Sequence, residues 1–201
     1  MKNWFRKRMK EKTDCLIQGE VNLKIRTPQE VGERILALLA VIGKVHQGND
    51  NRFLDWFREN AIVLYLSDNE KLFIETNEPI QKQIVNFSWK AEALTSLLWS
   101  VELILEMPEL NKEFDVYSVE EISSIIQSPN TFIKNIRLRP NSEFEKMERD
   151  LVHEHWRIRD AQLFGKEIPK ELNSSVVYER RYALSWLVGW GEDWDNVPTD
   201  T

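Results

Sequence analysis

The stretch TPQEVGERILALLAVIGKVH, residues 27–46, decides the fold class of this chain. Thr27 and Glu30 have the spacing of a capping box, in which a hydroxyl and a carboxylate three residues later satisfy free amides at a helix N-terminus. Pro28 occupies the first helical position, where no amide donor is needed. Apolar side chains then recur every three or four residues, at Val31, Ile35, Leu38, Leu39, Ile42 and Val45. The stretch therefore predicts a helix that ends near His46.

Further helices are predicted from the same two signals, N-terminal capping residues and apolar periodicity. We expect them over 50–60, from 67, within 79–106, from 118, over 142–165 and over 175–190. Two short runs, VNLKI (21–25) and IVLYL (62–66), have the apolar character of strands. The expected fold is mainly α: a single-domain helical bundle of about seven to eight helices, with at most a small two-stranded patch.

The composition is that of an ordinary globular domain. The chain has 201 residues, of which 42% are hydrophobic and 30% charged, with seven glycines and seven prolines. The one cysteine, Cys15, excludes an intramolecular disulfide and favours a reducing, cytoplasmic compartment. The longest uncharged apolar run, from Ile35 to Ile42, is too short to span a bilayer.

Charge divides the chain into a basic arm, residues 1–12, and a helical domain, residues 13–201. The arm holds six Lys or Arg against one Glu, so it carries +5 and the rest of the chain −11 of the total of −6. A basic arm with Trp4 and Phe5 suits contact with nucleic acid or an anionic membrane, or docking of its aromatic residues on its own domain, which is commoner. Because phosphate contacts need clustered Lys and Arg, the acidic body argues against nucleic-acid binding.

The stretch HEHWRIRD, residues 153–160, gathers unusual chemistry on one predicted helix. At about 100° per residue, His153 and His155 point to opposite sides, so they cannot bind one metal ion together. Among the nearby residues, Asp150 and His153 have a spacing that suits a helical metal pair. With three histidines in the chain, we expect no metal site and no cofactor.

Polar side chains interrupt the apolar faces of the last two long helices. One arc of the 142–165 helix is charged and suits solvent, whereas the apolar arc, with Trp156 among its members, also holds Glu148, His155 and Arg159. On the 175–190 helix, the same projection places Glu179 and Arg180 on the apolar face. The residues expected on the solvent side of that helix are Arg181, Tyr178 and Ser185.

A buried guanidinium needs a partner, because an unpaired charge in a low-dielectric interior is costly. We therefore expect Arg159 and Glu179 to form a bidentate ion pair between the two helices. His155, Glu148 and Arg180 are expected beside it. The cluster is either a structural network that fixes helix packing or a polar pocket for an anionic ligand, with His155 able to exchange a proton near neutral pH.

Several motifs resemble a bacterial family known as domain of unknown function 4272. They are DLVHEHWRIRDA (150–161), VVYERRYALSWL (176–187) and DWDNVPTDT (193–201), with TPQEVGERILAL and FSWKAEALTSLLW upstream in the same order. The resemblance spans about residues 13–201 and implies no activity. The positions that match are Asp150, His155, Trp156, Arg159, Glu179, Arg180, Trp186, Trp194, Asp195, Asp200 and Thr201. The chain departs from the pattern at Ser185, where Asn is expected.

Two functions from different classes fit this sequence. The first is a cytoplasmic, non-enzymatic binding protein, an adaptor or immunity-type protein that holds a protein partner or a small anionic ligand through an acidic, tryptophan-rimmed surface. The second is a metal-independent hydrolase or nuclease that uses His155, Arg159, Glu179 and Arg180. The candidate site residues are His155, Trp156, Arg159, Glu179, Arg180 and Asp150. No serine-hydrolase, P-loop or dinucleotide-binding motif supports the enzyme, and the oligomeric state is not indicated.

Overall fold

The computed structural model describes residues 24–199 and is mainly α, as the sequence predicts. Within this range the chain forms helices and loops, and no strand. The α-helices are α2 (Pro28–Gln47), α3 (Asn51–Glu59), α4 (Asp68–Glu75), α5 (Gln81–Ser88), α6 (Lys90–Ser100), α7 (Glu121–Gln127), α8 (Pro129–Asn135), α9 (Asn141–Leu163) and α10 (Ser174–Leu187). Two short 3-10 helices are η1 (Ile62–Tyr65) and η2 (Val116–Ser118). The predicted arm, residues 1–12, lies outside the described residues.

Helix α2 is the centre of the bundle. The predicted capping box is confirmed: the Thr27 hydroxyl accepts from the Glu30 amide, and the Glu30 carboxylate accepts from the Thr27 amide at 2.7 Å. Most of the helix is buried, and it contacts α3, α4, α5, α6 and α8. Its apolar face and those of α6 and α10 form one continuous hydrophobic core.

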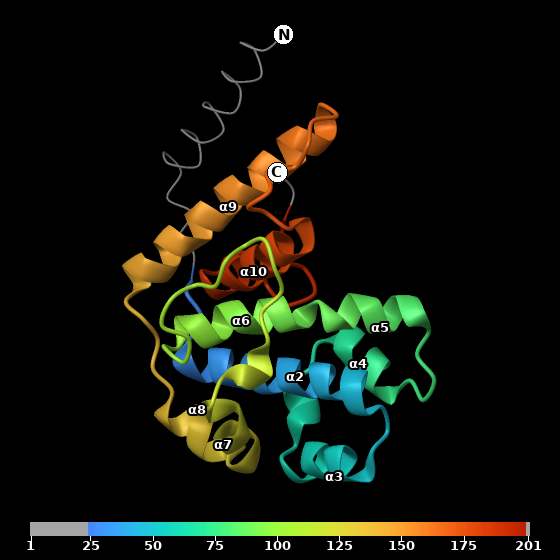
Figure 1. Ribbon diagram of the computed structural model, residues 1–201. Helices are drawn as coiled ribbons and strands as arrows, with labels where there is room; N and C mark the ends of the chain where they lie inside the picture. The colour runs from blue at the N-terminus through green and yellow to red at the C-terminus, as the bar shows by residue number, and fades with distance from the viewer. Residues whose placement is uncertain (1–23, 200–201) are drawn as a thin grey trace.

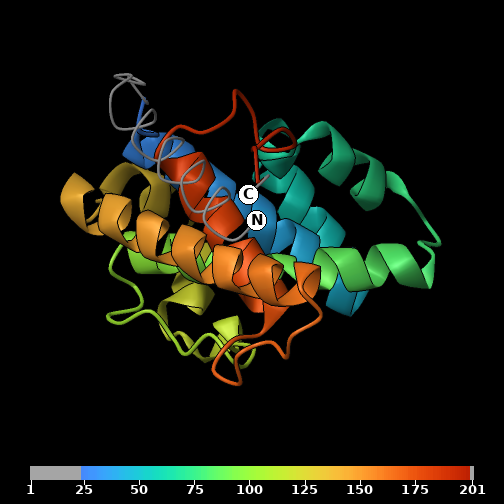
Figure 2. The same cartoon turned by 90° about the horizontal axis from the view of Figure 1, so that it is seen from above.

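The helices stack in layers, which Figures 1 and 2 show from two sides. Helix α6 packs between α2 and α10, and the long α9 crosses α10 on the side away from α6. At the opposite side of the bundle, α3, α7 and α8 lie beneath α2. Because α10 is sandwiched between α6 and α9, its side chains meet protein in almost every direction.

The two predicted strand-like runs do not form strands in the described part of the chain. Residues 62–66 form η1 and its cap, because Ile62 and Leu66, four residues apart, are buried while Leu64 remains 76% exposed. Of the other run, residues 24–25 are described, and they form an irregular segment. The small two-stranded patch is therefore wrong for these residues.

Several helix boundaries differ from the sequence prediction. The 79–106 segment forms α5 and α6, which meet at Trp89, and the chain after Ser100 continues as an irregular loop. Helix α9 begins after Pro140 and ends close to the predicted residue. No helix in residues 24–199 is both long enough and apolar enough to cross a membrane.

Candidate functional site: an acidic pocket beside the C-terminal loop

Helix α10 carries two of the predicted site residues, Glu179 and Arg180. Because α10 is buried on nearly all sides, these two side chains contact different parts of the protein. Arg180, with no exposed surface, contacts α6: its Nε and Nη2 lie 2.8 and 2.7 Å from Oε2 of Glu92. Its Nη1 donates to the carbonyl oxygens of Pro108 and Glu109 at 2.6 and 3.1 Å. Arg180 therefore fastens the loop after α6 to the core.

Glu179 pairs with Lys90, and the predicted Arg159–Glu179 pair is wrong. Lys90 Nζ lies 2.9 and 3.1 Å from the two carboxylate oxygens of Glu179. Burial raises the pKa of Glu179, and the neighbouring ammonium opposes that rise. Arg159 is exposed on α9 and donates to Gln162 at 3.2 Å. The periodicity of a helix identifies its faces but cannot say which neighbour covers each face.

His155, on α9, contacts neither Glu179 nor Arg180 through a hydrogen bond; its partner on α10 is Arg181. Its Nδ1 accepts a hydrogen bond from Nη1 of Arg181, which also donates to the Thr199 carbonyl at 3.0 Å. The edge of the ring packs against Tyr178, with 5.7 Å between the centroids. Burial, followed by the charges of Arg181 and Arg159, lowers the pKa of His155 to about 4. His155 is therefore neutral at physiological pH.

Two residues predicted to face solvent are buried. Arg181 is 5% exposed, and Ser185, at 1%, donates to Oε1 of Glu148 at 3.0 Å. Both predictions were wrong because α9 covers the side of α10 that faces away from α6.

The remaining candidates lie on the outer side of α9. Asp150 is exposed and lies 3.6 Å from Lys146, and Trp156 is 37% exposed instead of buried. The structure thus does not bring the predicted site residues together in one cavity. Arg180 contacts Glu92, Glu179 contacts Lys90, and His155 contacts Arg181. The other three, Asp150, Trp156 and Arg159, are exposed on α9.

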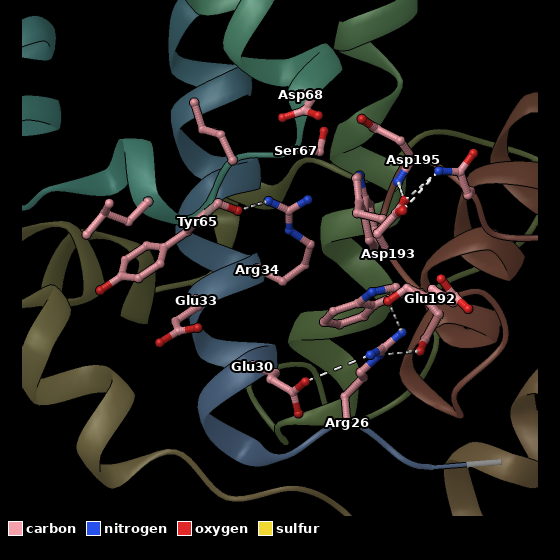
Figure 3. Close-up of a pocket in the computed structure, with 15 residues that line it drawn as sticks. Arg26, Glu30, Glu33, Arg34, Tyr65, Ser67, Asp68, Glu192, Asp193 and Asp195 are labelled. Atoms are coloured by element: carbon pink, nitrogen blue, oxygen red, sulfur yellow. Dashed lines mark hydrogen bonds and ion pairs between the residues drawn. The ribbon is translucent and has the colours of Figure 1, made fainter. Parts of the chain in front are cut away.

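A pocket of about 430 Å³ lies elsewhere, between α2, the segment from η1 to α4, and the loop after α10 (Figure 3). We call it the acidic pocket. Its lining residues are Arg26, Glu30, Glu33, Arg34, Leu64, Tyr65, Leu66, Ser67, Asp68, Trp186, Glu192, Asp193, Trp194, Asp195 and Asn196.

Two arginines of the pocket hold its walls together. Arg34 is buried in α2; it donates to the Tyr65 carbonyl and to Oε2 of Glu70, the latter at 2.9 Å. Its guanidinium carbon lies 4.8 Å from the centre of the Trp194 ring. Arg26 lies 5.1 Å from the Trp186 ring and donates to the Gly191 carbonyl at 2.8 Å. Both guanidinium groups are thus bonded within the protein.

Carboxylates dominate the rest of the pocket. Six of them line it against the two arginines, and Figure 3 shows Asp68, Asp195 and Asp193 beyond Arg34, with Glu30 and Glu33 on the other side. The Asp195 carboxylate accepts a hydrogen bond from the backbone N–H of Asn69 at 3.0 Å, and this bond fastens the C-terminal loop to the start of α4. Asp193 accepts from the Asp195 amide at 2.9 Å. The pocket therefore carries an excess of negative charge.

A second cavity of about 530 Å³ adjoins the first, and Trp194 and Asp195 line both. It contains the Lys90–Glu179 pair, so Glu179 is the predicted candidate that reaches a cavity. No three His, Cys, Asp or Glu side chains of residues 24–199 are grouped in a way that suits a metal ion.

The sequence shows some of the residues that line the acidic pocket as unusual, but it does not predict that they lie together. Trp194 and Asp195 belong to the motif DWDNVPTDT, and Arg34 is a charge in the middle of the apolar α2 stretch. Neither signal indicates that residues about 160 positions apart meet. That contact depends on where the loop after α10 returns.

A family model described as Domain of unknown function (DUF4272) matches residues 10–197. The chain belongs to this family. The match confirms the resemblance drawn from the motifs of α9, α10 and the C-terminal loop. Searches of curated proteins and of solved structures found no match. The family description assigns no activity, so the geometry of the site is the basis for a function.

Proposed function

We propose that this protein is a non-enzymatic binding protein whose acidic pocket receives a positively charged segment of a protein partner. The observation that supports this most is the excess of carboxylates in the pocket, of which Glu30 pairs with Arg26 and Asp68 with Lys71. Six carboxylates line it, and its two arginines already bond to Glu70, Glu30 and loop carbonyl oxygens. Glu192 is exposed beside them, and Glu33 accepts from Gln29, which is uncharged.

A lysine or arginine side chain is the complement of such a pocket. Carboxylates bind guanidinium and ammonium groups through charge-assisted hydrogen bonds, and charge complementarity also speeds the encounter. Trp186 and Trp194 also line the pocket, and each already packs against one of the pocket's own arginines, so the carboxylates are the groups that would contact the incoming cation. A small anionic ligand fits less well, because it would face the excess of carboxylates.

The enzyme hypothesis has less geometric support. Its four residues would have to meet around one substrate, yet Arg159 is exposed, Arg180 contacts Glu92 and His155 contacts Arg181. A catalytic base near pH 7 also needs a pKa near that value, and His155 titrates at about 4.

A cytoplasmic location is part of the proposal. It rests on Cys15, the one cysteine of the sequence, which fits a reducing compartment. The adaptor or immunity-type role is also part of the proposal, because proteins of either type would bind a basic protein partner through the acidic pocket.

The test is the affinity of an acetylated and amidated peptide of two arginines, glycine and alanine, measured by calorimetry at low and at physiological salt. Replacing both Glu33 and Glu192 by glutamine should weaken binding by about tenfold, because each exposed charge pair contributes on the order of 0.5–1 kcal/mol. Higher salt should weaken binding to the parent protein more than binding to this variant.

The matched control replaces Glu78 and Glu167 by glutamine. Both are exposed, and neither lines the acidic pocket, so the net charge changes equally while the pocket is untouched. Affinity that falls equally in both variants would mean that the peptide responds to overall charge, and the proposal would then fail.

A further inference from the structure

The second cavity differs from the acidic pocket in the chemistry of its walls. Six of its fourteen lining residues are aromatic, and three carry side-chain amides. We call it the aromatic hollow; it lies between α4, α5, the start of α6, α10 and the C-terminal loop. Its aromatic members are Phe73, Phe87, Trp89, Tyr178, Tyr182 and Trp194, and its amides are Asn69, Gln83 and Asn86. Such walls suit a flat ring that also forms hydrogen bonds.

Glu70 and Lys90 are two of the charged residues that line the hollow. Glu70 is 1% exposed, and its Oε2 accepts from Arg34 and from the Ser67 amide, both at 2.9 Å. Its Oε1 is buried and has no hydrogen-bond partner. Lys90 uses two donors on Glu179, and its ammonium lies 5.0 Å from the centre of the Tyr182 ring. The acceptors that line the hollow include the Glu179 and Asp195 carboxylates and the side-chain amide oxygens, so an occupant that donates a hydrogen bond is favoured.

The hollow and the acidic pocket share a wall. Trp194 and Asp195 line both cavities, and the Arg34–Glu70 pair joins them, because Arg34 lines the acidic pocket and Glu70 lines the hollow. Residues a short distance apart on one extended segment can therefore occupy the two cavities together.

We infer that the partner segment carries a tyrosine or tryptophan within a few residues of its basic residue, with the aromatic side chain seated in the hollow and the basic one in the acidic pocket. This inference rests on the proposed function. The charge of the hollow agrees with it: Glu70, Glu179 and Asp195 exceed Lys90, so a neutral or positively charged segment fits and a phosphorylated one does not.

The hydrogen-bonding groups distinguish among aromatic residues. A tyrosine hydroxyl or a tryptophan indole N–H can donate to a carboxylate or to an amide oxygen, whereas phenylalanine leaves these groups unpaired. Phenylalanine should therefore bind in the same place with lower affinity.

The test compares acetylated and amidated peptides in which two arginines are separated from tryptophan, phenylalanine or alanine by one to four glycines. At the best spacing, tryptophan should raise the affinity over alanine by about tenfold, as expected for burying an aromatic side chain. Phenylalanine should be roughly threefold weaker than tryptophan, because it donates no hydrogen bond.

A variant that fills the hollow tests whether the higher affinity of the tryptophan peptide arises there. Asn86 is exposed at the hollow, so Asn86→Trp should fill the space and abolish the tryptophan gain while leaving the alanine peptide unaffected. Asn130→Trp, at an exposed position on α8, is the matched control and should retain the gain.

The outcomes separate this inference from the proposed function. If no arginine peptide binds, both fail. If the alanine peptide binds in the acidic pocket and tryptophan adds nothing at any spacing, the proposed function stands and this inference is overturned. A tryptophan gain that survives Asn86→Trp also overturns it.

Discussion

Arg180 links α10 to α6 and to the loop that follows α6. Its side chain is completely buried, and its hydrogen bonds go to Glu92 of α6 and to the loop that follows α6. Burial lowers the pKa of Arg180, whereas Glu92 opposes that change. The side chain remains charged because arginine titrates far above neutral pH. Breaking a pair of this kind leaves an uncompensated charge in the interior.

Arg180→Ala and Glu92→Ala should each lower the free energy of unfolding by about 3–5 kcal/mol, measured by urea denaturation. The double variant should lose clearly less than the two single losses added, because the partners are in contact. Arg159→Ala, at an exposed position on α9, should cost under about 1 kcal/mol. Additive losses at Arg180 and Glu92 would contradict the pair.

His155 should make stability depend on pH. Its folded pKa of about 4 lies below the ordinary 6.5, so between these values the unfolded chain binds a proton that the folded protein rejects. The free energy of unfolding therefore falls as pH drops from about 6.5 toward 4, and the His155 contribution is constant above that window.

The measurement compares the parent with His155→Gln at pH 7 and pH 4.5 by chemical denaturation. Glutamine can still accept the Arg181 hydrogen bond but does not titrate, so the variant should lose less stability at the acidic pH. Burial raises the pKa of Glu148 and of Glu179, which acts in the opposite direction, but both proteins share those groups. Equal losses in both proteins would show that His155 does not titrate as described.

At the scale of elements, local signals predicted where helices lie but not how they pack. The capping box of α2 and the periodicity of α9 and α10 located these helices closely. The orientation of α10 was mispredicted at Arg181 and Ser185, because a helix covered on both sides has no solvent face for the pattern to reveal. Residues 62–66 were mistaken for a strand because a short apolar run has no diagnostic period.

The candidate site was predictable in part for the same reason. The sequence singled out Glu179 and Arg180 as buried charges, which the structure confirms. It paired Glu179 with the wrong helix, since Lys90 precedes it by 89 residues and no local rule links the two. The acidic pocket was missed because its walls come from both ends of the described chain.

The loop after α10 depends on Gly189. This residue has a φ of +102°, and a Cβ atom there would lie 2.6 Å from the Lys24 carbonyl oxygen. Gly189→Ala should therefore destabilise the protein by more than the 1–2 kcal/mol typical of a left-handed backbone, and should weaken peptide binding to the acidic pocket. The expected changes are a lower Tm and a lower affinity.

Gly165→Ala is the matched control for that prediction. Gly165 also has a positive φ, at +61°, but nothing lies within 4 Å of the position of its Cβ. It should lower the Tm slightly and leave peptide affinity unchanged. Equal effects of both substitutions would mean that the close approach to Lys24 does not hold the loop.

At the scale of the whole molecule, arginines connect irregular segments to the helices. Arg139 donates to the Trp99, Ile104 and Leu105 carbonyl oxygens, as Arg180 does to those of Pro108 and Glu109. Arg26 does the same for the C-terminal loop, which it holds against α10. These contacts position the carboxylates of that loop opposite α2 and α4. The acidic pocket is thus a product of the packing of the whole chain.

The most direct test of the central claim, that the acidic pocket binds a cation, follows the tryptophan indole N–H signals by NMR during titration with the arginine–alanine peptide. Single Trp→Phe substitutions assign the signals. The signals of Trp186 and Trp194, which line the pocket, should shift, while that of Trp156, partly exposed on α9, should remain unchanged. A shift of Trp156 with Trp186 and Trp194 unchanged would place the cation elsewhere and contradict the account.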